Sequence, residues 1–231
     1  MKTYPKWLSA AVLSAMLASP AAALETKAKN VILMDYDTGE YLFAENAFVP
    51  VAPASMSKLM TVYVLFSKLK DGTLSLEDVF SVSENAWRTG GAASGSSTMF
   101  LPIGSKVTVE NLIKGIIIQS GNDACIVAAE NIAGSEEDFA ELMNAKAKEL
   151  GLKNSHFVNS TGLPHPDHRM SAEDLARLAQ ALIRDFPEYY SVFSQKSFTY
   201  NNILQGNRNP LLYSMPDADG LKTGFTNASG Y

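Results

Sequence analysis

The chain has 231 residues, of which 46% are hydrophobic, and this is enough apolar sequence for one large domain with a substantial core. Its formal net charge of −5 at pH 7 argues against nucleic acid as a partner. A single cysteine excludes an internal disulfide, and the spacing of this cysteine and the three histidines does not suit a metal site, so no metal and no cofactor are expected.

Residues 1–23 have the pattern of a secretory signal peptide. Lys2 and Lys6 stand in front of an apolar stretch that is followed by small residues suited to cleavage. This stretch is too short for a transmembrane helix of about 20 residues, and Pro20 interrupts it. The sequence therefore predicts export and a mature chain over residues 24–231, in which no repeat or linker marks a second domain.

Two short runs of β-branched and aromatic residues follow in the mature chain. They cover residues 31–36 and 41–44, and the segment 37–40 between them has the composition of a tight turn. We expect a β-hairpin here.

A helix is predicted from Ser55 to Lys70, because apolar residues recur there at i, i+3 and i+4. Ser55 would open this helix, and Lys58 would project from the same face. The free N–H groups of a first turn suit an oxyanion and disfavour a protonated lysine. The pair is either a nucleophile beside its base or a helix cap beside a solvated lysine. The same spacing recurs in Ser67 and Lys70.

The rest of the chain alternates between loops, helices and strands. Residues 87–97 are rich in glycine and serine, and we expect a mobile surface loop there. Helix is predicted over 109–133 with a break in its middle, and an amphipathic helix over 136–150. Strands are predicted later, at 197–200 and 220–226.

The segment 156–170 contains a glycine and two prolines and is predicted as loop. His165 and His168 lie in it, and without a third ligand nearby we interpret both as surface residues rather than as metal ligands or bases. The next helix is predicted to start after Ser171 as its N-cap and to end before Pro187.

Two further motifs carry side chains suited to acyl-transfer chemistry. Ser120 and Asn122 supply a hydroxyl and a carboxamide at the predicted helix break. Lys222, Thr223 and Gly224 supply a cation, a hydroxyl and an unobstructed backbone on a predicted strand. Each motif is short and weak by itself, so the information lies in the order of all three along the chain.

The order serine–lysine, serine–glycine–asparagine and lysine–threonine–glycine resembles the signature of the penicillin-binding proteins and serine β-lactamases. Within this group the chain is most similar to the low-molecular-mass D-alanyl-D-alanine carboxypeptidases. The phrases at 52–60, 120–125 and 219–226 carry this closer resemblance. It extends over nearly the whole mature chain, from about Lys29 to Tyr231.

The resemblance implies an α/β fold of the α+β type, in which an antiparallel sheet is flanked by helices and the site lies at the junction with a helical region. Two later strands and a C-terminal helix follow the lysine–threonine–glycine strand in this family. We therefore expect the penicillin-binding domain over residues 24–231 to be incomplete at its C-terminus. The resemblance also implies a periplasmic protein, peripheral to the inner membrane through a C-terminal helix that this chain does not contain.

The implied activity is that of a serine-type D-Ala-D-Ala carboxypeptidase. Such an enzyme removes the terminal D-alanine from peptidoglycan stem pentapeptides through an acyl-enzyme, and it binds β-lactam antibiotics covalently. By resemblance, Ser55 is the nucleophile, Lys58 the base, and Ser120 the group that passes a proton to the leaving amine. The residues implied to contact the substrate are Asn122, Lys222, Thr223, Gly224 and Phe225. Backbone N–H groups of Ser55 and Phe225 would form the oxyanion hole.

Two alternatives share the three motifs. A class A β-lactamase would need a glutamate four residues before an asparagine, and this spacing occurs nowhere in the sequence, whereas the other serine β-lactamase classes stay open. A non-catalytic binding or structural protein on the same fold would be expected to have lost Ser55 or Lys58, and both are present. The single cysteine, Cys125, is either a small buried hydrophobe or a thiol that lies against the site.

Overall fold

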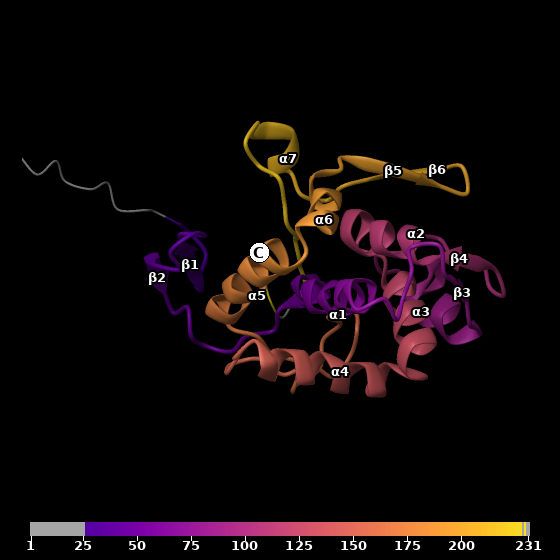
Figure 1. Ribbon diagram of the computed structural model, residues 1–231, viewed down its shortest axis with the longest axis horizontal. Helices are drawn as coiled ribbons and strands as arrows, with labels where there is room; N and C mark the ends of the chain where they lie inside the picture. Colours follow the sequence, from indigo (N-terminus) through magenta and orange to yellow (C-terminus); the bar gives the residue numbers. More distant parts are fainter. Residues whose placement is uncertain (1–25, 228, 230–231) are drawn as a thin grey trace, which may run out of the picture.

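A computed structural model describes residues 26–227 and residue 229, so the predicted signal peptide at 1–23 lies outside the described residues. Figure 1 shows a helical body with α1 running through its middle and short β-strands around its rim. The α-helices are α1 (Lys58–Lys70), α2 (Val109–Lys114), α3 (Asn122–Ala133), α4 (Glu136–Glu149), α5 (Ala172–Asp185), α6 (Pro187–Tyr190) and α7 (Leu211–Ser214).

The strands pair as three separate antiparallel ribbons. They are β1 (Val31–Met34) with β2 (Tyr41–Glu45), β3 (Val79–Ser81) with β4 (Lys106–Thr108), and β5 (Ser197–Tyr200) with β6 (Ile203–Gly206). The predicted hairpin of β1 and β2 and the strand β5 are confirmed. The described strands do not join into one sheet, because each ribbon pairs only within itself.

The predicted strand at 220–226 is wrong for the described part of the chain, where this segment belongs to no ladder. A strand needs a neighbouring backbone to take its hydrogen bonds. Here the carbonyl of Gly220 instead accepts a bond of 2.7 Å from the Asn209 side chain. The segment is partly buried, and Leu221 packs against the core.

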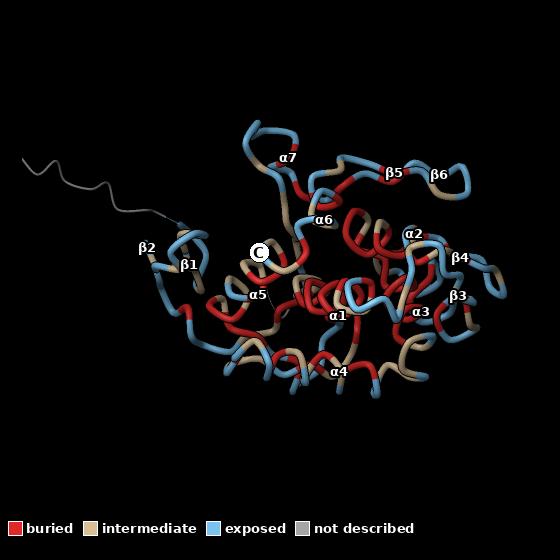
Figure 2. Tube along the Cα trace, in the orientation of Figure 1, coloured by how far each residue is buried: buried red, intermediate tan, exposed pale blue. Residues whose placement is uncertain are grey.

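The core centres on α1, which is buried almost all around, as the red tube in Figure 2 shows. A helix that is hydrophobic on all sides belongs in the interior of a domain. On its outer half, Phe66 packs against the rings of Phe186, Tyr189 and Phe193. At its other end, α1 presents its first turn, and with it Lys58, to the interior of the domain.

The α-helix begins later than the sequence predicts. Ala54–Ser57 forms a 3-10 turn, and Ser57 is the N-cap of α1 although its side chain makes no capping hydrogen bond. The turn starts from a left-handed residue, Ala54, with φ of +50°. Ser55 therefore sits on a tight turn ahead of the helix, while Lys58 is the first residue of the helix itself.

The predicted helix break is confirmed. After α2, residues Gly115–Gln119 form a wider π-helical turn that ends at Ser120, whose φ of +64° is left-handed. The chain then enters α3 at Asn122. The predicted boundaries of α4 and α5 are also confirmed, and Ser171 caps α5 by accepting the N–H of Asp174 at 3.1 Å.

The glycine-rich segment 87–97 is more ordered than the sequence predicts. Ala86–Gly90 forms a π-helical turn and Ala92–Ser94 a 3-10 turn, and the first of these packs against α3. A Cβ on Gly90 would lie 2.5 Å from the backbone nitrogen of Asp123. The glycine is thus needed for close packing of two backbones, which composition alone does not distinguish from flexibility.

The segment 156–170 is loop as predicted, but the interpretation of His168 as a surface residue is wrong. His165 is exposed, whereas His168 is 2% exposed and packs edge-on against Phe157. Its Nδ1 accepts the N–H of Val158 at 3.2 Å, which requires a neutral ring. Burial, followed by the charges of His156 and His165, lowers the pKa of His168 to about 4.

This buried imidazole predicts a loss of stability in mild acid. Between pH 6.5 and about 4 the unfolded chain binds a proton at His168 that the folded chain excludes, so stability falls as the pH falls through this window, by about 3 kcal/mol in all. We expect His168→Asn to remove most of this dependence. The measurement is urea unfolding at pH 7, 5.5 and 4.5. The exposed His165→Asn variant is the control, and an identical pH dependence in both variants would contradict the argument.

Candidate active site

Lys58 is the centre of the candidate site. Its side chain is fully buried, and its Nζ lies within hydrogen-bond distance of three oxygens from three parts of the chain. These are Ser55 Oγ at 3.1 Å, Asn122 Oδ1 at 2.7 Å and the carbonyl oxygen of Thr161 at 2.5 Å. The structure thus brings the first two sequence motifs together on a single amine.

The three partners of Lys58 suit both protonation states of the amine. A protonated amine donates three hydrogen bonds, whereas a neutral amine donates two and keeps a lone pair. Asn122 and Thr161 accept the two shorter bonds, and both are acceptors at the atoms concerned. In the neutral state the lone pair is left facing the hydroxyl of Ser55, which is the geometry that a general base needs.

The surroundings favour the neutral form. Burial lowers the pKa of Lys58 and is the largest influence on it. A thiolate at Cys125 would oppose this, but burial raises the pKa of that thiol to about 12, so the thiol is neutral. Glu136 and Asp123 favour the charged lysine, and Arg208 disfavours it.

Of the second motif, Asn122 contacts the buried amine from the first residue of α3, and Ser120 lies two residues before it. Asn122 is nearly fully buried, and its Nδ2 donates to Ser96 Oγ at 2.9 Å while its Oδ1 accepts from Lys58. Ser120 is 3% exposed, and its Oγ has no hydrogen-bond partner within residues 26–227 and 229. A buried hydroxyl with unused hydrogen-bonding capacity is suited to bind or relay a proton from a group that enters the site.

The third motif approaches the turn that carries Ser55. A Cβ on Gly224 would lie 3.0 Å from the backbone nitrogens of Ser55 and Met56, so a residue without a side chain is needed there. Lys222 is partly buried, and its Nζ donates to the carbonyl of Thr223 at 2.9 Å. Phe225 is 52% exposed, at the outer edge of this approach.

The pKa of Lys222 is lowered as well. Burial, and then the nearby charge of Lys58, lower the pKa of Lys222 to about 7. Two amines in one low-dielectric site each disfavour the other's proton.

Two contributors to the site were missed from the sequence. Thr161 supplies the backbone carbonyl on Lys58, and Ser96 accepts from Asn122. A backbone carbonyl has no residue signature, so the only sequence signal for Thr161 is the neighbouring Gly162. That glycine has φ of +78°, and a Cβ on it would lie 2.0 Å from the carbonyl oxygen of Ala54.

Cys125 is fully buried on α3, among the apolar side chains of the core. Its raised pKa keeps the thiol protonated and unreactive at neutral pH. The interpretation of Cys125 as a small buried hydrophobe is therefore the one that the structure supports.

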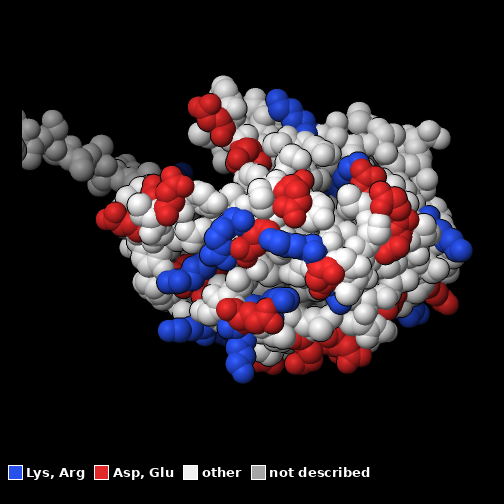
Figure 3. Space-filling model, viewed as in Figure 1, with Lys and Arg blue, Asp and Glu red and all other residues white. Residues whose placement is uncertain are grey.

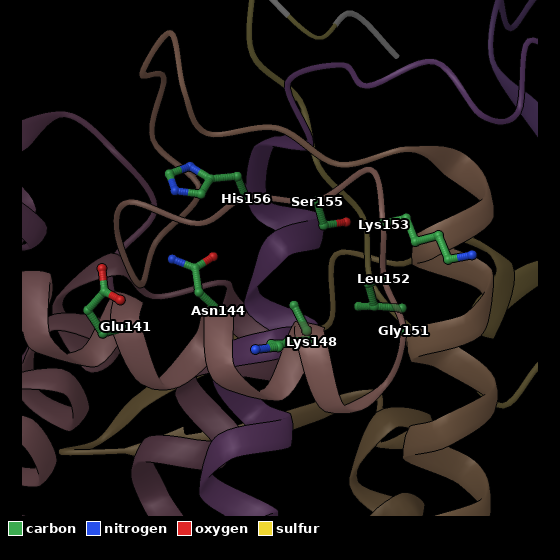
Figure 4. A pocket seen from close by; sticks show the side chains of 9 residues that line it. Glu141, Asn144, Lys148, Gly151, Leu152, Lys153, Ser155 and His156 are labelled. Carbon is green, nitrogen blue, oxygen red and sulfur yellow. The ribbon is translucent and has the colours of Figure 1, made fainter.

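One surface hollow lies away from the three motifs. It has a volume of about 520 Å³ and lies between α4 and the loop after it. Figure 4 shows residues that line it, among them Glu141, Lys148 and His156. None of its lining residues belongs to the three motifs. In the described part of the chain, no group of three or more histidine, cysteine, aspartate or glutamate side chains is placed to hold a metal ion. The described helices are also too short or too polar to cross a membrane.

Comparison with known proteins identifies the family. A family model described as D-alanyl-D-alanine carboxypeptidase, peptidase family S11, matches residues 16–231. The chain belongs to this family. It is 49% identical over 202 residues to D-alanyl-D-alanine carboxypeptidase DacC of Escherichia coli (strain K12), which covers 87% of this chain and 50% of the relative.

Two further members of the group show how far the similarity extends. A D-alanyl-D-alanine endopeptidase of Pseudomonas aeruginosa is 32% identical over 97% of this chain and 74% of its own length. The solved structure of penicillin binding protein 5 from Haemophilus influenzae superposes with a TM-score of 0.87 at 40% identity, over 91% of this chain and 61% of that one. The predicted penicillin-binding fold is therefore confirmed. The chain spans about half the length of its Escherichia coli relatives.

Proposed function

We propose that this chain carries the acyl-transfer site of a serine-type D-Ala-D-Ala carboxypeptidase, which removes the terminal D-alanine from peptidoglycan stem pentapeptides. The observation that supports this most is the buried Lys58, whose pKa is lowered by burial and whose Nζ lies 3.1 Å from the hydroxyl of Ser55. Names of relatives that this chain matches over most of its own length support the same substrate class.

The proposed mechanism has two covalent steps. Ser55 attacks the carbonyl of the penultimate D-alanine while Lys58 takes the hydroxyl proton, and Ser120 passes a proton to the leaving D-alanine. Water then attacks the ester and frees the shortened peptide. For Lys58 to act as base near neutral pH, its pKa must fall from about 10.4 toward 7. The desolvation described above acts in that direction.

The remaining motif residues are proposed to hold the substrate. Asn122 is proposed to contact the substrate amide, and Lys222 with Thr223 to bind its terminal carboxylate. The N–H groups of Ser55 and Phe225 are proposed as the oxyanion hole. Gly224 supports this assignment, because its contact with the backbone of Ser55 brings the two segments together.

The decisive experiment is mass spectrometry after incubation with benzylpenicillin. We expect the intact protein to gain the mass of one penicillin as an ester, because a β-lactam presents a strained amide and a carboxylate like those of D-Ala-D-Ala. Peptide mapping should place it on Ser55, and Ser55→Ala should abolish it. Ser67→Ala is the matched control, since Ser67 heads the second serine–lysine pair of the same helix. An ester on Ser67 would overturn the assignment.

The same experiment separates the alternatives. A serine β-lactamase would hydrolyse the ester within seconds, whereas a carboxypeptidase would retain it for minutes or longer. An endopeptidase activity is the second candidate, supported by the Pseudomonas relative that this chain covers over 74% of its length. Two assays distinguish these activities. One measures cleavage of a substrate in which two stem peptides are cross-linked, and the other measures release of D-alanine from a pentapeptide.

The proposed setting is the periplasm, where the protein would be exported, act on peptidoglycan and bind β-lactams, peripheral to the inner membrane. The apolar N-terminal segment and the names of the relatives support this proposal. Figure 3 shows acidic and basic side chains interspersed over the face in view. With the net charge of −5, this supports a partner other than nucleic acid.

A further inference from the structure

Glu136 links the first turn of α4 to the loop beneath Lys58. Its Oε1 accepts the backbone N–H of Ser160 at 3.1 Å and the hydroxyl of the same residue at 2.5 Å. Ser160 is fully buried, and its carbonyl accepts a bond of 2.7 Å from Thr61 Oγ1. The residue that precedes Thr161 is therefore held at its N–H, its hydroxyl and its carbonyl.

This fixed point lies one residue from the carbonyl on the candidate base. The Thr161 carbonyl accepts from Lys58 Nζ, and Thr61 lies one helical turn after Lys58 on α1. Glu136 and Thr61 thus hold the loop against α1 from two sides. The loop does not depend on them alone, because Asn159 Oδ1 also accepts the N–H groups of Thr161 and Gly162 at 3.2 and 2.7 Å.

Glu136 also acts on Lys58 through its charge. The other charged or titratable groups that act on the lysine are Asp123 and Cys125 on α3, Arg208 after β6, and Lys222 of the third motif. Of the two carboxylates, Glu136 has the larger effect on the lysine. The carboxylate of Asp123 binds another segment, because it accepts the backbone N–H groups of Met99 and Leu101.

We propose that Glu136 is a positioning residue for the base of this site: through Ser160 it fixes the Thr161 carbonyl on Lys58, and its carboxylate stabilises the protonated lysine. The inference rests on the proposed function of Lys58. It assigns to α4, which carries none of the three motifs, a role in tuning the reaction.

The test separates charge from geometry. Glu136→Gln keeps an oxygen that accepts from Ser160 but removes the charge, so the pKa of Lys58 should fall. The measured quantity is the rate of acylation by fluorescent penicillin as a function of pH. The rise of this rate with pH should shift to lower pH by about 0.5 to 1 unit, with little change in the plateau rate. Glu136→Ala removes the acceptor as well, and the plateau rate should fall about tenfold because the base is less well oriented.

Glu137→Gln is the matched control, since Glu137 is an exposed glutamate on the same turn of α4. A pH profile of Glu136→Gln that overlays that of Glu137→Gln would overturn the electrostatic part, and an unchanged plateau in Glu136→Ala would overturn the positioning part. If Glu136→Ala does not fold, the Gln variant decides.

A second readout does not depend on acylation. The Lys58 resonance, assigned by its loss in Lys58→Arg, can be titrated by NMR of protein labelled with [¹³Cε]lysine. We expect its pKa to be lower in Glu136→Gln than in the wild type. Absence of acylation in the wild type would refute the proposed function alone, because this titration still tests the influence of Glu136 on the lysine.

Discussion

Replacement of Lys58 by arginine is expected to reduce the acylation rate by about 10³-fold, within the range that general base catalysis contributes in enzymes. Arginine keeps the positive charge, but it cannot be deprotonated in a protein and so cannot accept the proton of Ser55. Its planar guanidinium must also fit into the space of the Lys58 amine, which is fully buried between Asn122 and Thr161. The measurement is the second-order rate of labelling by fluorescent penicillin.

Lys222→Arg is the comparison, and we expect it to cost about tenfold or less, because the proposed role of Lys222 needs a cation rather than a base. A melting curve for each variant separates loss of the base from loss of the fold. Equal tolerance of the two replacements would mean that Lys58 is not the base.

Replacement of Gly162 by alanine is expected to lower the free energy of unfolding by more than about 3 kcal/mol and to abolish labelling. The new Cβ would lie 2.0 Å from the carbonyl oxygen of Ala54 and 2.5 Å from Ser57 Oγ, and both atoms belong to the turn that carries Ser55. Either the turn or the loop must move, and the loop also carries the Thr161 carbonyl that contacts Lys58. Urea unfolding and penicillin labelling measure the two effects.

Gly151→Ala is a matched control for the backbone conformation. Gly151 has φ of +71°, close to the +78° of Gly162, but a Cβ there would meet nothing within 4 Å. It should cost only the strain of a left-handed alanine, about 1–2 kcal/mol, and labelling should persist. If both variants behave alike, the close approach of the loop to the Ser55 turn is not what makes Gly162 necessary.

The elements that the sequence predicts well have strong local signals. The periodicity of α1, the serine cap of α5, and the turn between β1 and β2 are encoded within each segment and appear in the structure. The helix break at Ser120 is also local, since glycine and asparagine follow it. The order of the three motifs then identifies the family, although each motif alone is ambiguous.

What could not be predicted depends on distant parts of the chain. His168 is buried against Phe157, eleven positions earlier in the chain. The residues next to His168 in the sequence do not indicate this burial. The segment 220–226 has the composition of a strand, but pairing depends on a neighbour that lies elsewhere. The carbonyl oxygen of Thr161 contacts Lys58, which lies 103 positions earlier in the sequence. The contact uses only the backbone of Thr161, so the residue type at this position does not reveal it. Packing glycines such as Gly90 look the same in sequence as flexible ones.

The buried amine of Lys58 has a consequence for how the protein acquires its chemistry. Its partners lie 64 and 103 positions away in the sequence, in Asn122 and Thr161. Contacts between such distant segments require closure of long loops, which folding chains achieve late and slowly compared with helix formation. In a chain whose helices have formed but whose segments have not docked, the lysine would be in water with an ordinary pKa. It would then be protonated near neutral pH and could not accept a proton. On the proposed mechanism Ser55 therefore has no base until these long-range contacts close, so acylation requires the docked fold.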